Sequence, residues 1–121
     1  MRVTALLPVA FTLSAIALLA QPSNQTRREP QFENEHVKVW KSIIMPNQPL
    51  TMHRHEHPRA IIALTGGTLK LVKDSGPAGA LTWETGKAYW LTADPPGELH
   101  GDLNEGKTPV EVIVVELQKV N

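Results

Sequence analysis

Apolar and polar side chains alternate in short runs along most of this chain, and turn-forming residues separate one run from the next. Alternation with a period of two indicates β-strands, because successive side chains of a strand point to opposite faces. No stretch carries a convincing helical period, so the pattern predicts an all-β domain built as a small sandwich or barrel. We expect eight strands, at residues 37–44, 50–55, 59–65, 68–73, 80–84, 87–92, 99–103 and 110–117.

The residues between these runs predict how the strands connect. Gly66-Gly67 favours a tight hairpin between the strands on either side of it. Residues 74–79 contain an aspartate, a serine, a proline and two glycines and indicate a loop, and residues 94–97 indicate a rigid turn. The last run, at residues 110–117, is apolar on both faces, which predicts a central strand that is covered on both sides.

The first twenty residues differ from the rest, with an uncharged run from Val3 to Ala20 after a single arginine. A basic start, an apolar run and small residues at its end are typical of a secretory signal peptide. We therefore expect residues 1–20 to be removed on export and the mature protein to be secreted or periplasmic. An uncleaved amino-terminal anchor is the alternative. Residues 21–34 are polar and predict a flexible linker, which leaves residues 35–119 as one folded domain.

The chain has 12 basic and 12 acidic side chains and no cysteine. A nucleic-acid partner requires a basic surface, so the balanced charge argues against one. We also expect no membrane span once the signal peptide is removed. The lack of cysteine excludes disulfide bonds and thiolate metal sites.

Three of the five histidines are clustered between residues 53 and 57. His53 and His55 are two positions apart on a predicted strand, so both imidazoles can point to the same side. Imidazole nitrogen binds Fe, Mn, Zn, Ni and Cu, but two such ligands do not hold an ion firmly. His100, after the turn, is the strongest candidate for a third ligand, with His36 and His57 as the others. The sequence thus predicts a site for one divalent transition metal.

Two segments around these histidines resemble the two motifs of the cupin family. The first is His53-x-His55-xxx-Arg59-xxxxxx-Gly66, and the second is Pro95-x-Gly97-xx-His100-xxx-Asn104, with Gly86 ahead of it. The resemblance covers roughly residues 35–118 and implies a double-stranded β-helix, the jelly-roll barrel of the cupins. It also implies a metal inside the barrel near one mouth, with His53, His55 and His100 as its ligands.

The first motif departs from the cupin pattern at its ligand glutamate, whose position Arg59 occupies. A guanidinium has no lone pair to give a metal. Either the site uses three histidines, or His57 or Glu56 supplies a fourth ligand, or the barrel holds no metal. Arg59 itself either lies near the ion, where it would hold a carboxylate or a metal-bound anion, or faces out in a surface ion pair with Glu56. Asn47 replaces the leading glycine and tolerates the same turn geometry.

Other polar and aromatic residues have simpler expected roles. Glu98 and Asp102 flank His100, where either would orient a ligand imidazole or remain solvated in a loop. His36 is expected on the surface. We expect core positions, rather than contacts with a ligand, for three aromatic residues, Trp83, Tyr89 and Trp90.

A site of three imidazoles resembles that of the thiol dioxygenases in its ligand set, and it would leave coordination positions open for oxygen or a small-molecule substrate. We therefore expect an exported metal-binding cupin with dioxygenase-like or isomerase activity. The alternative is a non-catalytic periplasmic module that captures a metal ion or a small ligand, and a third interpretation is a structural barrel without metal. An exposed strand edge would favour a homodimer.

Overall fold

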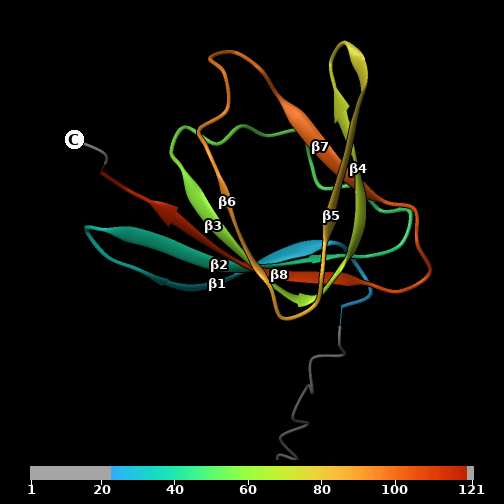
Figure 1. Cartoon of the computed structure of the whole chain (residues 1–121), viewed down its shortest axis with the longest axis horizontal. Helices are drawn as coiled ribbons and strands as arrows, with labels where there is room; N and C mark the ends of the chain where they lie inside the picture. Colours follow the sequence, from blue (N-terminus) through green and yellow to red (C-terminus); the bar gives the residue numbers. More distant parts are fainter. Residues whose placement is uncertain (1–22, 120–121) are drawn as a thin grey trace, which may run out of the picture.

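The structure, a computed structural model, describes residues 23–119. The described part contains no helix, and hence none that could cross a membrane. The predicted signal peptide lies outside the described residues. Figure 1 labels eight strands in chain order: β1 (Arg27–Glu33), β2 (Val37–Ile44), β3 (Arg59–Thr65), β4 (Gly67–Lys73), β5 (Gly76–Trp83), β6 (Ala88–Leu91), β7 (His100–Asn104) and β8 (Val110–Leu117).

The strands form two antiparallel sheets that face each other as a barrel (Figure 1). The larger sheet has the strand order β1-β2-β8-β3-β6, and the smaller sheet has the order β5-β4-β7. β8 therefore lies at the centre of the larger sheet, as its doubly apolar sequence predicts, although Ile113 and Val115 on its outer face are only half-buried. Four of the six strand pairings join strands that are not consecutive in the chain, so distant segments meet inside the barrel.

The flexible linker predicted for residues 21–34 is wrong for half of its length. Residues Arg27–Glu33 form β1, which pairs with β2 from Arg27↔Ile43 to Glu33↔Lys38. An edge strand needs little apolar surface and tolerates charged side chains. The Glu29 carboxylate, for example, lies 2.9 Å from the Arg27 guanidinium and 3.1 Å from the Lys41 ammonium group. The folded domain therefore begins before residue 35.

Three local predictions in the middle of the chain are also wrong. Gly66-Gly67 does not form a hairpin, because β3 and β4 belong to different sheets. The chain passes between the sheets at Gly66, where a Cβ would lie 2.2 Å from the Trp83 carbonyl oxygen, so close approach requires the glycine. Residues 50–55 form no strand, and a single bridge joins His53 to His100. The loop predicted at residues 74–79 is shorter, since β5 begins at Gly76.

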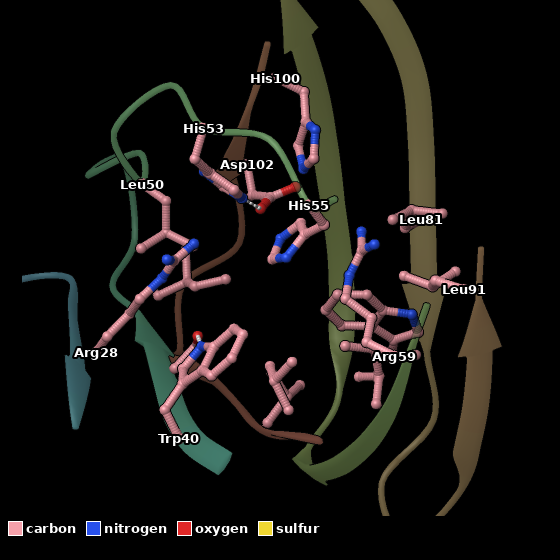
Figure 2. Close-up of a pocket in the computed structure, with 16 residues that line it drawn as sticks. Arg28, Trp40, Leu50, His53, His55, Arg59, Leu81, Leu91, His100 and Asp102 are labelled. Carbon is pink, nitrogen blue, oxygen red and sulfur yellow. Dashed lines mark hydrogen bonds and ion pairs between the residues drawn. The ribbon is translucent and has the colours of Figure 1, made fainter. Parts of the chain in front are cut away.

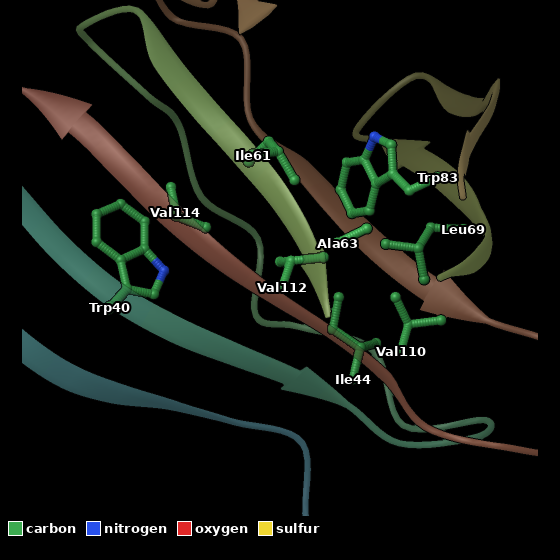
Figure 3. Packing of buried hydrophobic residues seen from close by; sticks show 9 residues of the cluster. All are labelled: Trp40, Ile44, Ile61, Ala63, Leu69, Trp83, Val110, Val112 and Val114. Atoms are coloured by element: carbon green, nitrogen blue, oxygen red, sulfur yellow. The ribbon is translucent and has the colours of Figure 1, made fainter. Parts of the chain in front are cut away.

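The hydrophobic core fills the space between the two sheets (Figure 3). Alternate, inward-facing residues of β2, β3 and β8 pack against Leu69 and Trp83 from the smaller sheet. Trp83 lies in the core as predicted, and Tyr89 packs against it. Trp90 does not belong to the core: it lies on the edge strand β6 and is 58% exposed. The nine core residues are Trp40, Ile44, Ile61, Ala63, Leu69, Trp83, Val110, Val112 and Val114.

Two asparagines fix the loops beside the core. Asn104, the last residue of the second motif, is buried, and its Nδ2 donates to the carbonyl oxygens of Ile44 at 2.9 Å and Thr108 at 2.8 Å. Asn47 adopts a φ of 57°, which is the left-handed region expected of a residue that replaces the motif glycine. Its backbone N–H donates to the Asn104 carbonyl at 2.7 Å. The motif asparagine therefore has a structural role in this chain.

We expect Leu69→Ala to lower the free energy of unfolding by about 2–5 kcal/mol, because Leu69 is fully buried and its truncation leaves a cavity between the sheets. Urea unfolding followed by tryptophan fluorescence measures the loss. Leu64→Ala is the matched control. Leu64 lies on the neighbouring strand in the chain, β3, but its side chain is exposed, so its truncation should cost much less. Equal losses in the two variants would contradict this packing.

Candidate metal site

The structure brings His53, His55 and His100 together inside the barrel (Figure 2). One ligand nitrogen from each ring lies within 4.8 Å of the other two. The ring centroid of His53 is 4.9 Å from that of His55 and 4.4 Å from that of His100. Two backbone hydrogen bonds hold the segments side by side, because the N–H groups of His53 and His100 each donate to the other residue's carbonyl oxygen at 2.8 Å. The cluster expected from the sequence is therefore formed by the fold.

Each of the three rings has an oxygen atom beside its Nδ1. The Nδ1 of His53 lies 2.6 Å from the Thr51 carbonyl oxygen, and the Nδ1 of His55 lies 2.6 Å from Oε2 of Glu116. The Nδ1 of His100 lies 3.4 Å from Oδ2 of Asp94. The hydrogen bonds of His53 and His55 select the tautomer that carries its proton on Nδ1 and leaves the Nε2 lone pair free for a metal. These two imidazoles are thus arranged as metal ligands usually are, and the Asp94 carboxylate lies near the corresponding nitrogen of His100.

Sequence reasoning missed the two carboxylates that lie beside the Nδ1 atoms of His55 and His100. Glu116 follows Val112 and Val114 on the inward-facing side of β8, and a carboxylate in this apolar series could have indicated that it points into the barrel. Asp94 begins the turn after β6, and its Oδ2 also accepts the backbone N–H of His55 at 2.7 Å. The turn predicted at residues 94–97 therefore also places a carboxylate in contact with both His55 and His100.

Burial favours the neutral, metal-binding form of two of the imidazoles, those of His53 and His100. Desolvation lowers the pKa of His53 to about 4, although the hydrogen bond to Thr51 opposes the shift. Desolvation also lowers the pKa of His100, against the opposing charges of Asp102 and Asp94. The Trp40 ring is parallel to His55 with its centroid 6.1 Å away, so an aromatic face shields this side of the cluster. Three imidazole nitrogen donors fit a divalent transition metal.

Arg59, which replaces the ligand glutamate of the first motif, faces into the barrel and is 6% exposed. It shares the inward side of β3 with Ile61 and Ala63, which decides between the two orientations left open by the sequence. Its Nη1 donates to the Thr92 carbonyl at 3.2 Å, and its Nη2 lies 3.6 Å from Oδ1 of Asp94. The guanidinium is therefore held toward the loop after β6, beside the imidazoles (Figure 2).

The other candidates from the sequence lie outside the histidine cluster. Glu56 is exposed and pairs with Arg54 at 3.1 Å, so it is neither a ligand nor the partner of Arg59. His57 is half-buried but is not among the converging nitrogens. Glu98 pairs with Lys73 on β4 rather than with His100. His36 is exposed, as expected.

Two cavities that share several lining residues lie beside the cluster. The smaller one, of about 40 Å³, lies among the imidazoles, Trp40 and the core. The larger one, of about 250 Å³, is lined by apolar side chains of β4, β5 and β6 and by the loop that carries Asp94. Arg59 and His100 line both cavities, so the candidate metal site borders a space for a small molecule. The apolar side chains of the larger cavity are Leu71, Leu81 and Leu91.

The metal-free protein should lose stability as the pH falls from about 6.5 toward 4. In this range the unfolded chain protonates His53, whose ordinary pKa is about 6.5, while the folded protein keeps it neutral with a pKa of about 4. Urea unfolding of the wild type and of His53→Gln at a series of pH values measures the effect. The variant should show a smaller pH dependence, whereas His36→Gln at an exposed site should match the wild type. A wild-type pH dependence in His53→Gln would refute the depressed pKa.

Comparison with known proteins identifies the fold through solved structures alone. No protein-family model matches the sequence, and no curated protein matches it. Solved structures do match, among them a cupin domain from Bordetella pertussis Tohama I, with a TM-score of 0.68 and 22% identity over 83% of this chain and 100% of the other.

Two further matches agree with the first. A protein with a double-stranded β-helix domain from Klebsiella pneumoniae has a TM-score of 0.59 and 22% identity, over 81% of this chain and 82% of the other. An RmlC-like cupin protein from Desulfovibrio desulfuricans has a TM-score of 0.57 and 18% identity, over 92% and 100% of the two chains. This chain therefore has the double-stranded β-helix fold of the cupins, with three histidines placed together as in a cupin metal site.

Proposed function

We propose that this protein holds one divalent transition metal on His53, His55 and His100 and uses it to bind and transform a small molecule. The observation that carries the proposal is the convergence of three ring nitrogens within 4.8 Å, with an oxygen beside the Nδ1 of every ring. Iron, manganese, zinc, nickel and copper all suit a set of imidazole ligands. The choice among them depends on metal supply as much as on this donor set.

Three histidine ligands leave coordination positions for a substrate, as in catalytic rather than structural metal sites. When bound, the ion supplies Lewis-acid or redox chemistry. The chain supplies the binding surface: the leucines of the larger cavity pack against an apolar group, and Arg59 binds an anionic one. Asp94 holds Arg59 and borders His100, so it fixes the guanidinium relative to the metal site. These features support dioxygenase-like or isomerase chemistry on a small carboxylate.

A second candidate function is non-catalytic capture of a metal ion or a small ligand. Two of the carboxylates around the cluster are already engaged, since Glu116 faces the His55 ring, and Asp94 contacts both Arg59 and the His55 backbone. Neither is free to act as a general base, which favours a binding module. Metal-dependent turnover of a small carboxylic acid separates the two functions, because a binding module would bind the acid unchanged.

We also propose that the protein acts outside the cytoplasm. The uncharged run at residues 3–20 supports secretion or transport to the periplasm. The edge strand β6 carries the exposed Trp90, which supports association of two copies through this edge. Amino-terminal sequencing of the protein recovered from the periplasm or medium would locate the cleavage site.

The purified wild-type protein should contain about one equivalent of a divalent transition metal, and His100→Ala should lose most of it, because two imidazoles do not hold an ion firmly. Elemental analysis after size-exclusion chromatography measures the content. His36→Ala is the matched control and should retain the metal, since the His36 side chain is exposed and contacts Glu35 rather than the three histidines. Equal metal contents in wild type and His100→Ala would argue against the proposed site.

Glu116→Ala should weaken metal binding about 10- to 100-fold, because it removes the carboxylate that orients the His55 ring and increases its basicity. Competition with a chromophoric zinc chelator measures the dissociation constant. Glu111→Ala tests the same change on the same strand at a position that faces away from the cluster. Unchanged zinc affinity in Glu116→Ala would show that the Glu116–His55 contact does not support the ligand.

A further inference from the structure

Asp102 is a carboxylate inside the barrel that the roles described above leave without a function. It lies on β7 two residues after His100, so both side chains point to the same side of the strand. The residue is 8% exposed and lines the small cavity among the imidazoles. Figure 2 shows its carboxylate close to the His53 ring, with the His55 ring on its other side.

The position of Asp102 differs from that of the other two carboxylates in one respect. Glu116 and Asp94 lie beside Nδ1 atoms. The Oδ2 atom of Asp102 instead lies 3.9 Å from the Nε2 of His53, the nitrogen left free for a metal. This distance is too long for a hydrogen bond. Asp102 therefore stands on the metal side of the cluster.

The carboxylate of Asp102 accepts no hydrogen bond from the described residues 23–119, and neither of its oxygens is fully buried. Its backbone carbonyl accepts the N–H of Leu50 at 3.1 Å. A divalent cation at the cluster would compensate this largely buried carboxylate better than the surrounding side chains do.

We propose that Asp102 is a fourth ligand of the metal, so that the site is three imidazoles and one carboxylate, and a six-coordinate ion keeps two positions open for a substrate. The inference rests on the proposed metal-binding function. A zinc-like ion lies about 2.0–2.1 Å from a histidine nitrogen and about 2.0–2.2 Å from a carboxylate oxygen, so two ligand atoms 3.9 Å apart can share one ion.

This arrangement gives a reason for the arginine in the first motif. The carboxylate ligand comes from β7 in the smaller sheet instead of from position 59 on β3 in the larger sheet. Arg59 then contributes a positive charge near Asp102, as does Arg28, whose guanidinium lies 5.3 Å from the centre of the Trp40 ring. Arg59 is thereby left free to bind substrate without removing the carboxylate from the site.

Cobalt(II) titration of the full chain tests the proposal with Asp102→Asn and the control Glu98→Gln. Asp102→Asn should bind cobalt at least about tenfold more weakly and show an altered visible spectrum, because a ligand oxygen is lost. Glu98→Gln removes a carboxylate on the other side of His100, one that pairs with Lys73, and should match the wild type. Wild-type affinity and spectrum in Asp102→Asn would overturn the assignment while leaving the three histidines as ligands. A wild type that binds no cobalt would instead refute the metal-binding function itself.

Asp102→Cys gives an independent readout that does not depend on a loss of affinity. The chain has no cysteine, so an intense near-ultraviolet charge-transfer band on cobalt addition would come from a thiolate at position 102 bound directly to the metal. Circular dichroism confirms that the variant is folded before the titration. Cobalt binding to the folded variant without that band would overturn the proposal, because a residue that only orients a histidine would not produce it.

Discussion

Two backbone hydrogen bonds between His53 and His100 are the interaction on which the candidate site depends. They join the irregular segment before β3 to the first residue of β7, two parts of the chain that are separated by four strands. Because the backbones of His53 and His100 are paired by hydrogen bonds of 2.8 Å, their imidazoles lie on the same side. His55, two residues after His53, places its imidazole beside them. The short separation of the ring nitrogens therefore follows from main-chain pairing.

The barrel around this pairing combines an apolar half with a polar half. The core of valines, isoleucines and tryptophans fills the space between the sheets below the histidines, and Trp40 forms the boundary by stacking against His55. Above that boundary the inward-facing positions carry Arg59, Asp102 and Glu116. Burying these groups is unfavourable unless they are paired, and the ring nitrogens and guanidinium groups supply most of the partners. A polar pocket of this kind indicates a function, because a core made only of apolar residues would be easier to stabilise.

The sequence predicts the central strands better than the edges. Alternation identified β2, β3 and β8 with the bounds that the structure shows, because these strands carry the apolar residues of the core. It missed β1, whose polar sequence is compatible with a strand only because it pairs with β2 at a sheet edge. The hairpin predicted at Gly66-Gly67 was wrong for a related reason. Glycine is required at position 66 because the Trp83 backbone, which is distant in sequence, approaches closely.

The three histidines could be predicted from their spacing and from the resemblance to cupin motifs. Glu116 and Asp94 could not, since their contacts arise from strand pairing and loop packing.

The central claim is that three imidazoles bind one ion inside this barrel. Anomalous diffraction from crystals of the zinc-loaded protein, collected at the zinc absorption edge, tests it most directly. We predict one peak at about 2.0–2.1 Å from the Nε2 atoms of His53, His55 and His100. A crystal with no peak among these rings, or with the Arg59 guanidinium in their midst, would contradict the claim.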